Sequence, residues 1–364
     1  MTAVGIVCSI LLCYSTKPSY IARRARKIAR SRTAHAVCAL SLFYICAFSV
    51  YKMYCSGEKM IVYRELSSVE ADLDFSAKTL YSLTNDIEKH YRRVEIPKHD
   101  GTFRVLYVPD TLLKTVQRRI ANRILSLEPI SRYATAYKKG SFIRKNASCH
   151  VGKETVLKLD IKHFFDSILY SHVKDKVFTE KRFSEPIRVL LTMLCYYKDR
   201  LPQGAPTSPV ITNIVMRDFD ETVGNWCNQR GITYTRYCDD MTFSGLFDIK
   251  EVKTFVKSEL RKMGFFLNEK KTVSARNTRR QTVTGIVVNE KLNVSSEYRK
   301  KLRQEVYYCR KYGVEEHLKR IGNSVDPKKY LQGLLGRISY VLEVRCDDKA
   351  FLADKAFIVG LIKQ

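Results

Sequence analysis

Two adjacent aspartates, Asp239 and Asp240, stand between two short segments rich in β-branched and aromatic residues. Residues 232–244 therefore predict a strand, a tight turn and a second strand. Adjacent carboxylates at the tip of a hairpin repel each other unless cations neutralise them. A solvated turn would explain this pair by itself, so a functional site requires a further acidic residue that the fold brings close.

A second acidic motif supplies that residue. The apolar segment 155–161 predicts a strand that leads into Asp160, and two aromatics, Phe164 and Phe165, follow. Asp160 at the end of one strand and Asp239 at a hairpin tip can meet at one edge of a sheet, where they would hold two Mg²⁺ ions. Two metal ions about 3.5–4 Å apart clamp the attacking and leaving oxygens of a phosphoryl displacement, as in polymerases.

A loop rich in glycine and proline, residues 201–209 (LPQGAPTSP), lies between the two acidic motifs. Glycine lets a backbone approach a ligand closely, and Ser208 is expected to cap the helix that follows. A plain loop would have the same composition, and only its place between the aspartates indicates a function.

The charge of the chain restricts its partners. Its 364 residues carry a formal net charge of +27, and 45% of them are apolar. Such a chain is globular and favours a polyanion, either nucleic acid or an anionic membrane surface. The 11 cysteines include no C-x-x-C pair, which argues against a zinc site and favours reduced thiols in the cytoplasm.

The three motifs in this order resemble the reverse transcriptase family, and two shorter motifs described below narrow the resemblance to its retron type. The order is an aspartate before two aromatics, then L-P-Q-G-x-x-x-S-P, then Y-x-D-D. The resemblance implies an α+β right-hand polymerase with an antiparallel palm sheet, and an RNA-directed DNA polymerase activity. Two alternatives stay open. One is another bacterial class, intron-encoded or diversity-generating, and the other is an RNA-binding or membrane defence component in which catalysis is dispensable.

The resemblance also assigns roles in the active site. The catalytic residues would be Asp160, Asp239 and Asp240, and Ile161 joins them as a metal ligand for two Mg²⁺ ions. Four positions match residues that meet the nucleotide or primer: Arg104, Phe165, Gln203 and Lys271. Phe165 would exclude ribonucleotides, and Lys270 is as near a candidate for the phosphate-binding lysine as Lys271.

Two shorter motifs narrow the family. Residues 146–150 (NASCH) match N-A-x-x-H, and residues 283–285 match V-T-G. A basic segment that interleaves cations with tyrosines follows, which suits phosphate contacts and base stacking. The RNA contacts that we expect from these three segments are Asn146, His150, Val283, Thr284, Gly285, Arg299, Lys300, Arg303, Tyr307 and Arg310.

The composition shifts near residue 56, which separates an apolar and basic extension over 1–56 from the rest of the chain. For the rest, the resemblance implies fingers over 57–154, a palm over 155–289 and a helical thumb over 290–364. Residues 34–54 are long enough to cross a bilayer, but a basic run precedes them and should stay on the cytoplasmic side. Three interpretations stay open: a membrane anchor, an arm lying on a membrane or on RNA, or an upstream extension before a true start at Met53 or Met60.

The local patterns predict the remaining elements. Helices are expected over 76–91, 111–127, 185–197, 209–229, 250–263 and 295–312, with a mostly helical tail. A hairpin is expected over 92–108, turning at Asp100 and Gly101. Leu113, Val116 and Ile120 share one helical face and should be buried.

The resemblance further implies the partners. They are a structured noncoding RNA that serves as template and primer, a single-stranded DNA product, dNTPs and a defence effector protein. The enzyme would act in anti-phage defence, in the cytoplasm or at a membrane through residues 1–55.

Overall fold

The computed structural model describes residues 61–97, 101–138 and 140–363. Residues 62–364 form one compact unit, and the description below concerns this unit. The predicted extension over 1–56 and its apolar segment over 34–54 lie outside the described residues. Within the described ranges, no helix is both long and apolar enough to cross a membrane.

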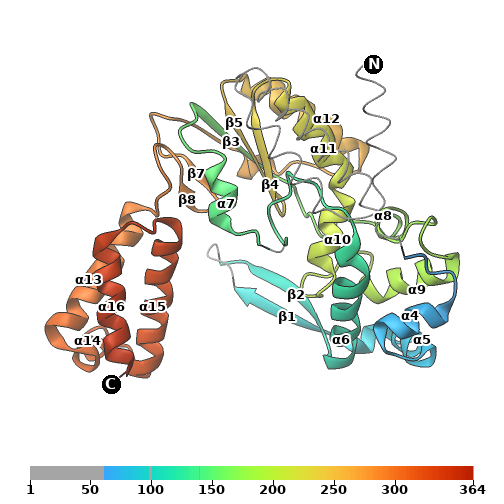
Figure 1. Ribbon diagram of the computed structural model, residues 1–364, viewed down its shortest axis with the longest axis horizontal. Coiled ribbons are helices and arrows are strands. Elements are labelled where there is room, and N and C mark those ends of the chain that lie inside the picture. Colours follow the sequence, from blue (N-terminus) through green and yellow to red (C-terminus); the bar gives the residue numbers. More distant parts are fainter. Residues whose placement is uncertain (1–60, 98–100, 139, 364) are drawn as a thin grey trace, which may run out of the picture. The chain divides into compact units, whose positions relative to one another are not determined.

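A four-stranded antiparallel sheet carries both acidic motifs (Figure 1). Its strand order is β4-β5-β3-β6. The strands are β3 (Thr155–Asp160), β4 (Thr233–Tyr237), β5 (Asp240–Gly245) and β6 (Val273–Arg276). The predicted strand over 155–161 and the strand-turn-strand over 232–244 are therefore confirmed, and so is the antiparallel sheet.

The two faces of this sheet differ in chemistry, because successive side chains of a strand point to opposite faces. One face is apolar: its side chains are at most 1% exposed and belong to the larger of two apolar cores. They are Leu157, Leu159, Met241 and Phe243. Alternation places Lys158, Asp160, Asp240 and Thr242 on the opposite face. The candidate catalytic groups thus sit on a polar face above a well-packed apolar one.

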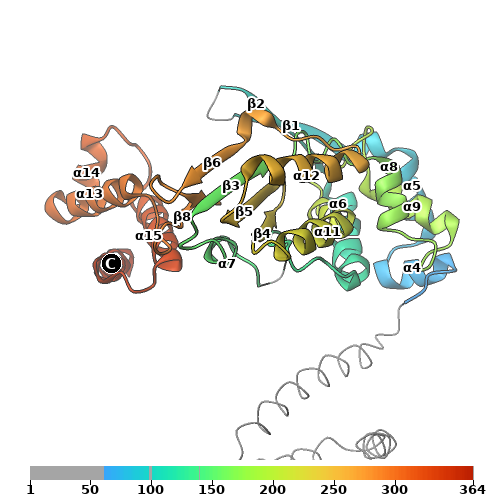
Figure 2. The ribbon, with the colours of Figure 1, turned by 90° about the horizontal axis from the view of Figure 1, so that it is seen from above.

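Five helices belong to this part of the chain, of which α11 packs against β4 and α12 packs against α11 (Figures 1 and 2). Their bounds are α8 (Tyr170–Lys176), α9 (Glu185–Cys195), α10 (Ser208–Val215), α11 (Arg217–Asn228) and α12 (Ile249–Lys262). The prediction of one helix over 209–229 is wrong, since Met216 with ψ −2° separates α10 from α11. The helix over 250–263 is confirmed, and Gly264 after it has the left-handed φ of +77° expected at a helix end.

The part before the sheet combines short helices with a hairpin. Its elements are α4 (Leu66–Leu73), α5 (Ala77–Asn85), η1 (Ile87–His90), β1 (Tyr91–Pro97), β2 (Phe103–Pro109), α6 (Thr111–Arg119), η2 (Ile120–Ile124), η3 (Leu125–Leu127) and α7 (Ile143–Ser148). Strands β1 and β2 pair as predicted. The predicted helix over 111–127 is helical throughout, but it loosens to a π-helical turn at Ile120 and ends in a 3₁₀ turn. Leu113, Val116 and Ile120 are fully buried, as expected.

The last part of the chain is mostly helical, as predicted. After η4 (Glu269–Lys271) and the short pair β7 (Thr282–Val283) and β8 (Ile286–Val287), four helices follow: α13 (Ser296–Tyr312), α14 (Val314–Arg320), α15 (Pro327–Val344) and α16 (Lys349–Lys363). A second apolar core joins these helices to β7, β8, Ala147 of α7 and Val156 of β3. The helical tail therefore shares its core with the N-A-x-x-H and V-T-G segments.

Candidate active site

The strand register brings the three predicted carboxylates to one end of the sheet. Asp160, the last residue of β3, is the direct partner of Asp240, the first residue of β5. The amide of Ile161 donates to the carbonyl oxygen of Asp239 at 3.2 Å. Because cross-strand partners have neighbouring side chains, the sheet itself places Asp160 beside the Asp239–Asp240 turn.

Asp160 is the buried member of the group, with 4% of its surface exposed. Its carboxylate accepts hydrogen bonds from Lys271 Nζ at 2.8 Å and from Asn268 Nδ2 at 3.1 Å. The amide of Asn268 also donates to the carbonyl oxygen of Asp160 at 2.8 Å. The structure thus brings Lys271, rather than Lys270, to the carboxylates. Sequence analysis missed Asn268, although it stands in the same N-E-K-K segment.

Negative charge accumulates around Asp240. Partial burial and, after it, the neighbouring Asp239 and Asp160 carboxylates together raise its pKa from 3.8 to about 6, against opposing effects of Lys271 and Lys158. The pKa of Lys271 is raised as well, by its hydrogen bond to Asp160, which keeps the ammonium group charged. The cations present in the chain therefore compensate the three carboxylates only in part.

This arrangement suits a divalent cation. Across the described ranges, no three acidic, histidine or cysteine side chains lie close enough together to form a metal site by themselves. The donor chemistry fits Mg²⁺ nevertheless, because that ion takes one or two carboxylates and completes its shell with water and substrate phosphates. Asp160, Asp239 and Asp240 would supply the carboxylates. Ile161 could contribute only its carbonyl oxygen, because its side chain is apolar and buried.

The loop between the acidic motifs is joined to neighbouring segments by two hydrogen bonds and closed by a third within the loop. The amide of Leu201 donates to the carbonyl oxygen of Phe165 at 3.1 Å, and the Gln203 carbonyl accepts from the Tyr107 amide at 2.9 Å. Ser208 Oγ donates to the Pro202 carbonyl at 2.7 Å. Ser208 therefore closes the loop and does not cap α10, whose cap residue, Thr207, makes no side-chain bond to the helix.

Gly204 permits the contact between this loop and β2. Its φ is +126°, and a Cβ built there would lie 2.7 Å from the carbonyl oxygen of Tyr107. No side chain fits so near a backbone oxygen, so the glycine is required where the loop passes the hairpin. Arg104 lies on the same strand and is exposed. Its role at the nucleotide stays a prediction.

The turn that carries Asp239 has an unusual backbone. Cys238 has a φ of +61°, a left-handed conformation that is uncommon for residues other than glycine. Its thiol is turned away from solvent, with 8% of the residue exposed, and Sγ accepts a hydrogen bond from Tyr137 Oη at 3.3 Å. Burial raises the pKa of this thiol to about 12, so it stays protonated.

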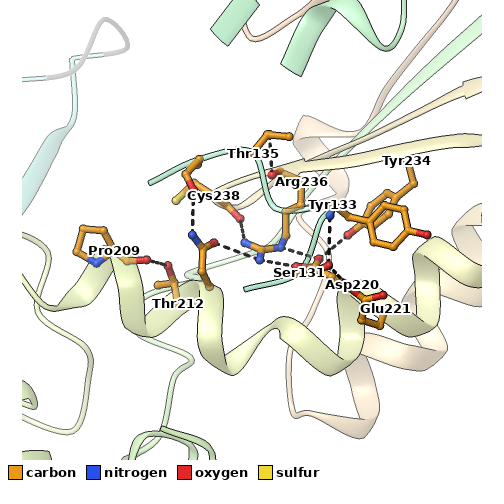
Figure 3. A network of polar contacts seen from close by, with 12 residues as sticks. Ser131, Tyr133, Thr135, Pro209, Thr212, Asp220, Glu221, Tyr234, Arg236 and Cys238 are labelled. Atoms are coloured by element: carbon orange, nitrogen blue, oxygen red, sulfur yellow. Dashed lines mark hydrogen bonds and ion pairs between the residues drawn. The ribbon is translucent and has the colours of Figure 1, made fainter. Parts of the chain in front are cut away.

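A buried ion pair lies directly beneath the turn (Figure 3). Arg236 and Asp220 are both 0% exposed, and Arg236 Nη2 lies 2.6 Å from Asp220 Oδ2. The sequence pattern did not single out either residue. The sequence did contain one indication of the pair: an arginine stands within a strand that is otherwise half apolar. Such an arginine is expected to be buried and therefore to need a carboxylate partner.

The N-A-x-x-H motif is internal. His150 is 0% exposed, and its ring nitrogens contact Ser244 Oγ at 2.7 Å and Thr235 Oγ1 at 2.8 Å. Burial lowers the pKa of His150 to about 4, so the ring is neutral. Asn146 is 1% exposed and accepts from Thr135 Oγ1.

Direct RNA contacts from these motif side chains are therefore not supported. Val283 is also fully buried. Thr284 and Gly285 form the turn between β7 and β8, with φ values of +47° and +83°, and Thr284 Oγ1 lies 3.5 Å from Asn146 Nδ2. The two motifs thus meet each other and pack the fold together, which corrects the expectation for Asn146, His150 and Val283.

The predicted contacts on α13 fall into two groups. Arg299 is mostly buried and pairs with Asp348, so it holds α13 to the start of α16. Lys300, Arg303 and Tyr307 are exposed. Arg310 is also exposed but contacts Asp354 at 2.8 Å. Lys300, Arg303 and Tyr307 are therefore accessible to RNA, and Arg310 is accessible while it contacts Asp354. Arg299 could meet RNA only by leaving Asp348.

Comparison with known proteins agrees with this geometry. The profile of the family described as reverse transcriptase (RNA-dependent DNA polymerase) matches residues 96–295. The chain is 32% identical to the retron Mx65 reverse transcriptase of Myxococcus xanthus, covering 76% of this chain and 68% of that protein. It is also 32% identical to the retron Ec86 reverse transcriptase of Escherichia coli, covering 67% of this chain and 78% of that protein.

A solved structure, telomerase from Candida albicans with a fragment of telomeric RNA, is more distant. It is 12% identical, with a TM-score of 0.43, over 74% of this chain and 63% of that chain.

Proposed function

Because this chain belongs to the retron-type reverse transcriptases and is an RNA-directed DNA polymerase, we propose that Asp160, Asp239 and Asp240 are its catalytic residues. The observation that carries the proposal is the pairing of Asp160 with Asp240 across β3 and β5, next to the turn at Asp239. The raised pKa of Asp240, which results from partial burial and from repulsion by the neighbouring carboxylates, supports it, because such a group is poised to bind a cation.

Two Mg²⁺ ions bound there would activate the primer hydroxyl and stabilise the leaving pyrophosphate during in-line displacement. The protein's contribution is to position the substrates. Lys271, partly exposed beside Asp160, would meet the phosphates of the incoming nucleotide. Phe165 is half-buried at the edge of the site, and its ring would clash with a ribose 2′-hydroxyl, so that deoxynucleotides are preferred.

The remaining nucleotide contacts belong to the loop and the hairpin. Gln203 is half-buried in the loop that β2 fastens, so its side chain would meet the primer or the incoming base. Arg104 on β2 would close over the phosphates, which need fixed cations. In this proposal, residues 57–154 are the fingers, 155–289 the palm and 290–364 the thumb.

The thumb would grip structured RNA. Lys300, Arg303, Tyr307 and Arg310 present cations and an aromatic ring on the exposed side of α13, a combination that suits phosphate contacts and base stacking. The overall charge of +27 favours the same partner. Thr284 and Gly285 lie at the neighbouring β7–β8 turn and could touch the same RNA with their backbone.

We propose further that the template is a noncoding RNA encoded beside the enzyme. A guanosine 2′-hydroxyl of that RNA would prime synthesis, and the product would be single-stranded DNA branched from RNA. The names of the relatives, which are retron reverse transcriptases, support this substrate. An anti-phage role with a separate effector protein is the biological setting that we propose.

The test is to express the chain together with its flanking DNA and to isolate small nucleic acids after RNase treatment. We expect a discrete single-stranded DNA whose mobility shifts after debranching enzyme. The matched control carries Asp239→Asn and Asp240→Asn and should give no such DNA. A product that persists in the control would contradict the catalytic assignment. A parent product that debranching enzyme leaves unchanged would contradict priming from a 2′-hydroxyl.

Residues 1–55 enter this proposal from sequence alone. The apolar stretch over 34–54 and the basic run before it suggest attachment to a membrane or a part in the effector. Membrane fractionation of the full chain tests the attachment, and recovery entirely in the supernatant would refute it.

A further inference from the structure

The turn that carries Asp239 is anchored from below by a side chain whose polar groups are all engaged. Arg236 lies on the apolar face of β4, opposite the catalytic face. Its Nε and Nη2 donate to the two oxygens of Asp220 at 2.8 and 2.6 Å. The remaining nitrogen, Nη1, donates to the carbonyl oxygen of Cys238 at 2.8 Å (Figure 3). The guanidinium therefore links helix α11 to the peptide that joins Cys238 to Asp239.

That peptide is the part of the turn that most needs fixing. Cys238 adopts its left-handed conformation with a φ of +61°, which a residue with a Cβ adopts only where the surroundings enforce it. The bond from Arg236 orients the carbonyl, and Tyr137 Oη holds the same residue through Sγ at 3.3 Å. A change in the ψ torsion of Cys238 would displace the Asp239 carboxylate, because Asp239 follows this peptide directly and moves with it.

The anchor is itself rigid. Tyr234 Oη donates to Asp220 Oδ1 at 2.9 Å, on the side of the ion pair that faces away from the turn. Asn213 Oδ1 accepts from Arg236 Nη2 at 3.3 Å, and Asn213 Nδ2 donates to the carbonyl of Ala136 at 2.9 Å. A planar guanidinium with fixed donors transmits this geometry, whereas a lysine ammonium would not.

We propose that Arg236, held by Asp220, is a positioning residue for catalysis: it fixes the Cys238–Asp239 peptide in the conformation that presents the Asp239 carboxylate to the reacting phosphate. The inference rests on the proposed catalytic role of Asp239. The Asp239→Asn variant tests that role separately, because its failure to abolish synthesis would refute the catalytic assignment whatever Arg236 does. A purely structural ion pair would affect stability and leave the turnover of the folded enzyme unchanged.

The first test compares Arg236→Lys with the control Tyr234→Phe in primer extension by the full chain on an RNA template. The lysine keeps a positive charge beside Asp220 but cannot reach both carboxylate oxygens and the Cys238 carbonyl. We expect kcat to fall on the order of 10- to 100-fold, since small misplacements at a reacting centre have effects of that size. The KM for dNTP should change by less than about threefold, and the Mg²⁺ concentration for half-maximal rate should rise.

The control touches the same buried pair without touching the turn. Tyr234→Phe removes one hydrogen bond to Asp220 and should lower the melting temperature, yet its kcat should stay within about threefold of the parent. Folding of each variant is checked by circular dichroism and by its melting transition before kinetics.

A second variant separates positioning from stability if the lysine chain does not fold. Asp220→Leu, Arg236→Met and Tyr234→Phe together remove both charges and the dependent hydroxyl. Replacing a buried ion pair with apolar residues of similar volume is often neutral for stability. This triple variant has no donor for the Cys238 carbonyl, so we expect a parent-like melting temperature and the same loss of kcat. A folded variant of either kind with parent-like kcat would overturn the proposal, and failure of both to fold would assign the pair to folding instead.

Discussion

Asp240→Asn should make the protein more stable and catalytically inactive at the same time. Partial burial and the neighbouring carboxylates raise the pKa of Asp240 from 3.8 to about 6. Each unit of pKa shift corresponds to about 1.4 kcal/mol, so the shift sets a ceiling of about 3 kcal/mol on the destabilisation. Asp240 is an exposed residue as a whole, although its surroundings partly desolvate the carboxylate. Solvent screening therefore reduces the destabilisation, and we expect about 1 kcal/mol.

The pH dependence follows from the sign of the shift. The folded chain holds the Asp240 proton more tightly than the unfolded chain does, so its stability decreases as the pH rises from about 4 through about 6. The asparagine variant lacks this loss. Its advantage should therefore be full above neutral pH and smaller at a pH of about 5.

The assay is thermal unfolding in EDTA at a pH of about 7.5 and about 5. A gain of about 1 kcal/mol in a unit of this size raises the melting temperature by about 1–3 °C. Asp199→Asn is the matched control, because Asp199 is exposed, far from the acidic cluster in sequence, and has a φ of +56° that asparagine tolerates. An Asp240→Asn chain that melts below the parent in EDTA, or a gain equal at both pH values, would refute the reasoning.

Three further changes test other parts of the site. Gly204→Ala should lower polymerase activity and destabilise the chain by about 1–3 kcal/mol, because the new Cβ meets the β2 backbone. Gly333→Ala is the control, because its Cβ would lie in open space on α15, and it should leave stability unchanged or raise it. Chemical denaturation measures the stability of both variants. Lys271→Ala should raise the KM for dNTP about tenfold or more, and Lys270→Ala should leave it near the parent value in the same primer-extension assay. His150→Ala should lower the free energy of unfolding by about 2 kcal/mol or more. Because burial lowers the pKa of this imidazole to about 4, the difference from the parent should shrink as the pH falls from about 6.5 toward 4, and a constant difference would count against the neutral buried ring.

The sequence predicted those features of the site that depend on local pattern. The patterns around Asp160 and around the Asp239–Asp240 pair indicated strands that lead into or out of carboxylates. Pairing these strands in one antiparallel sheet brings the carboxylates to the same edge. Choosing between Lys270 and Lys271 needed the structure, because adjacent residues of a 3₁₀ turn point in different directions and only one of them reaches Asp160.

The sequence could not reveal features that depend on distant partners. Arg236 and Asp220 lie 16 positions apart on different elements. An arginine within a half-apolar strand suggests a buried carboxylate partner, but no local pattern identifies Asp220 as that partner. His150 was expected at an RNA surface, because a family motif gives no information on burial. Its two hydroxyl partners, Thr235 and Ser244, belong to strands that follow 85 and 94 positions later.

The break between α10 and α11 shows a third limit. The apolar residues over 209–229 continue across Met216 without a proline or glycine at the junction, so periodicity predicted one helix. After the break, α11 carries Asp220, whose carboxylate pairs with Arg236 of β4, a tertiary contact that periodicity along the chain does not indicate.

The most direct test of the catalytic assignment is primer extension by the purified full chain on an RNA template with dNTPs and Mg²⁺. The comparison is with Asp160→Asn. Because Asp160 has 4% of its surface exposed and binds Lys271, the folding of this variant is first verified by its melting transition. We predict DNA synthesis by the parent and a loss on the order of a thousandfold or more in the folded variant. A folded Asp160→Asn chain that retains more than about a tenth of the parent rate would contradict the proposal that these carboxylates perform the chemistry.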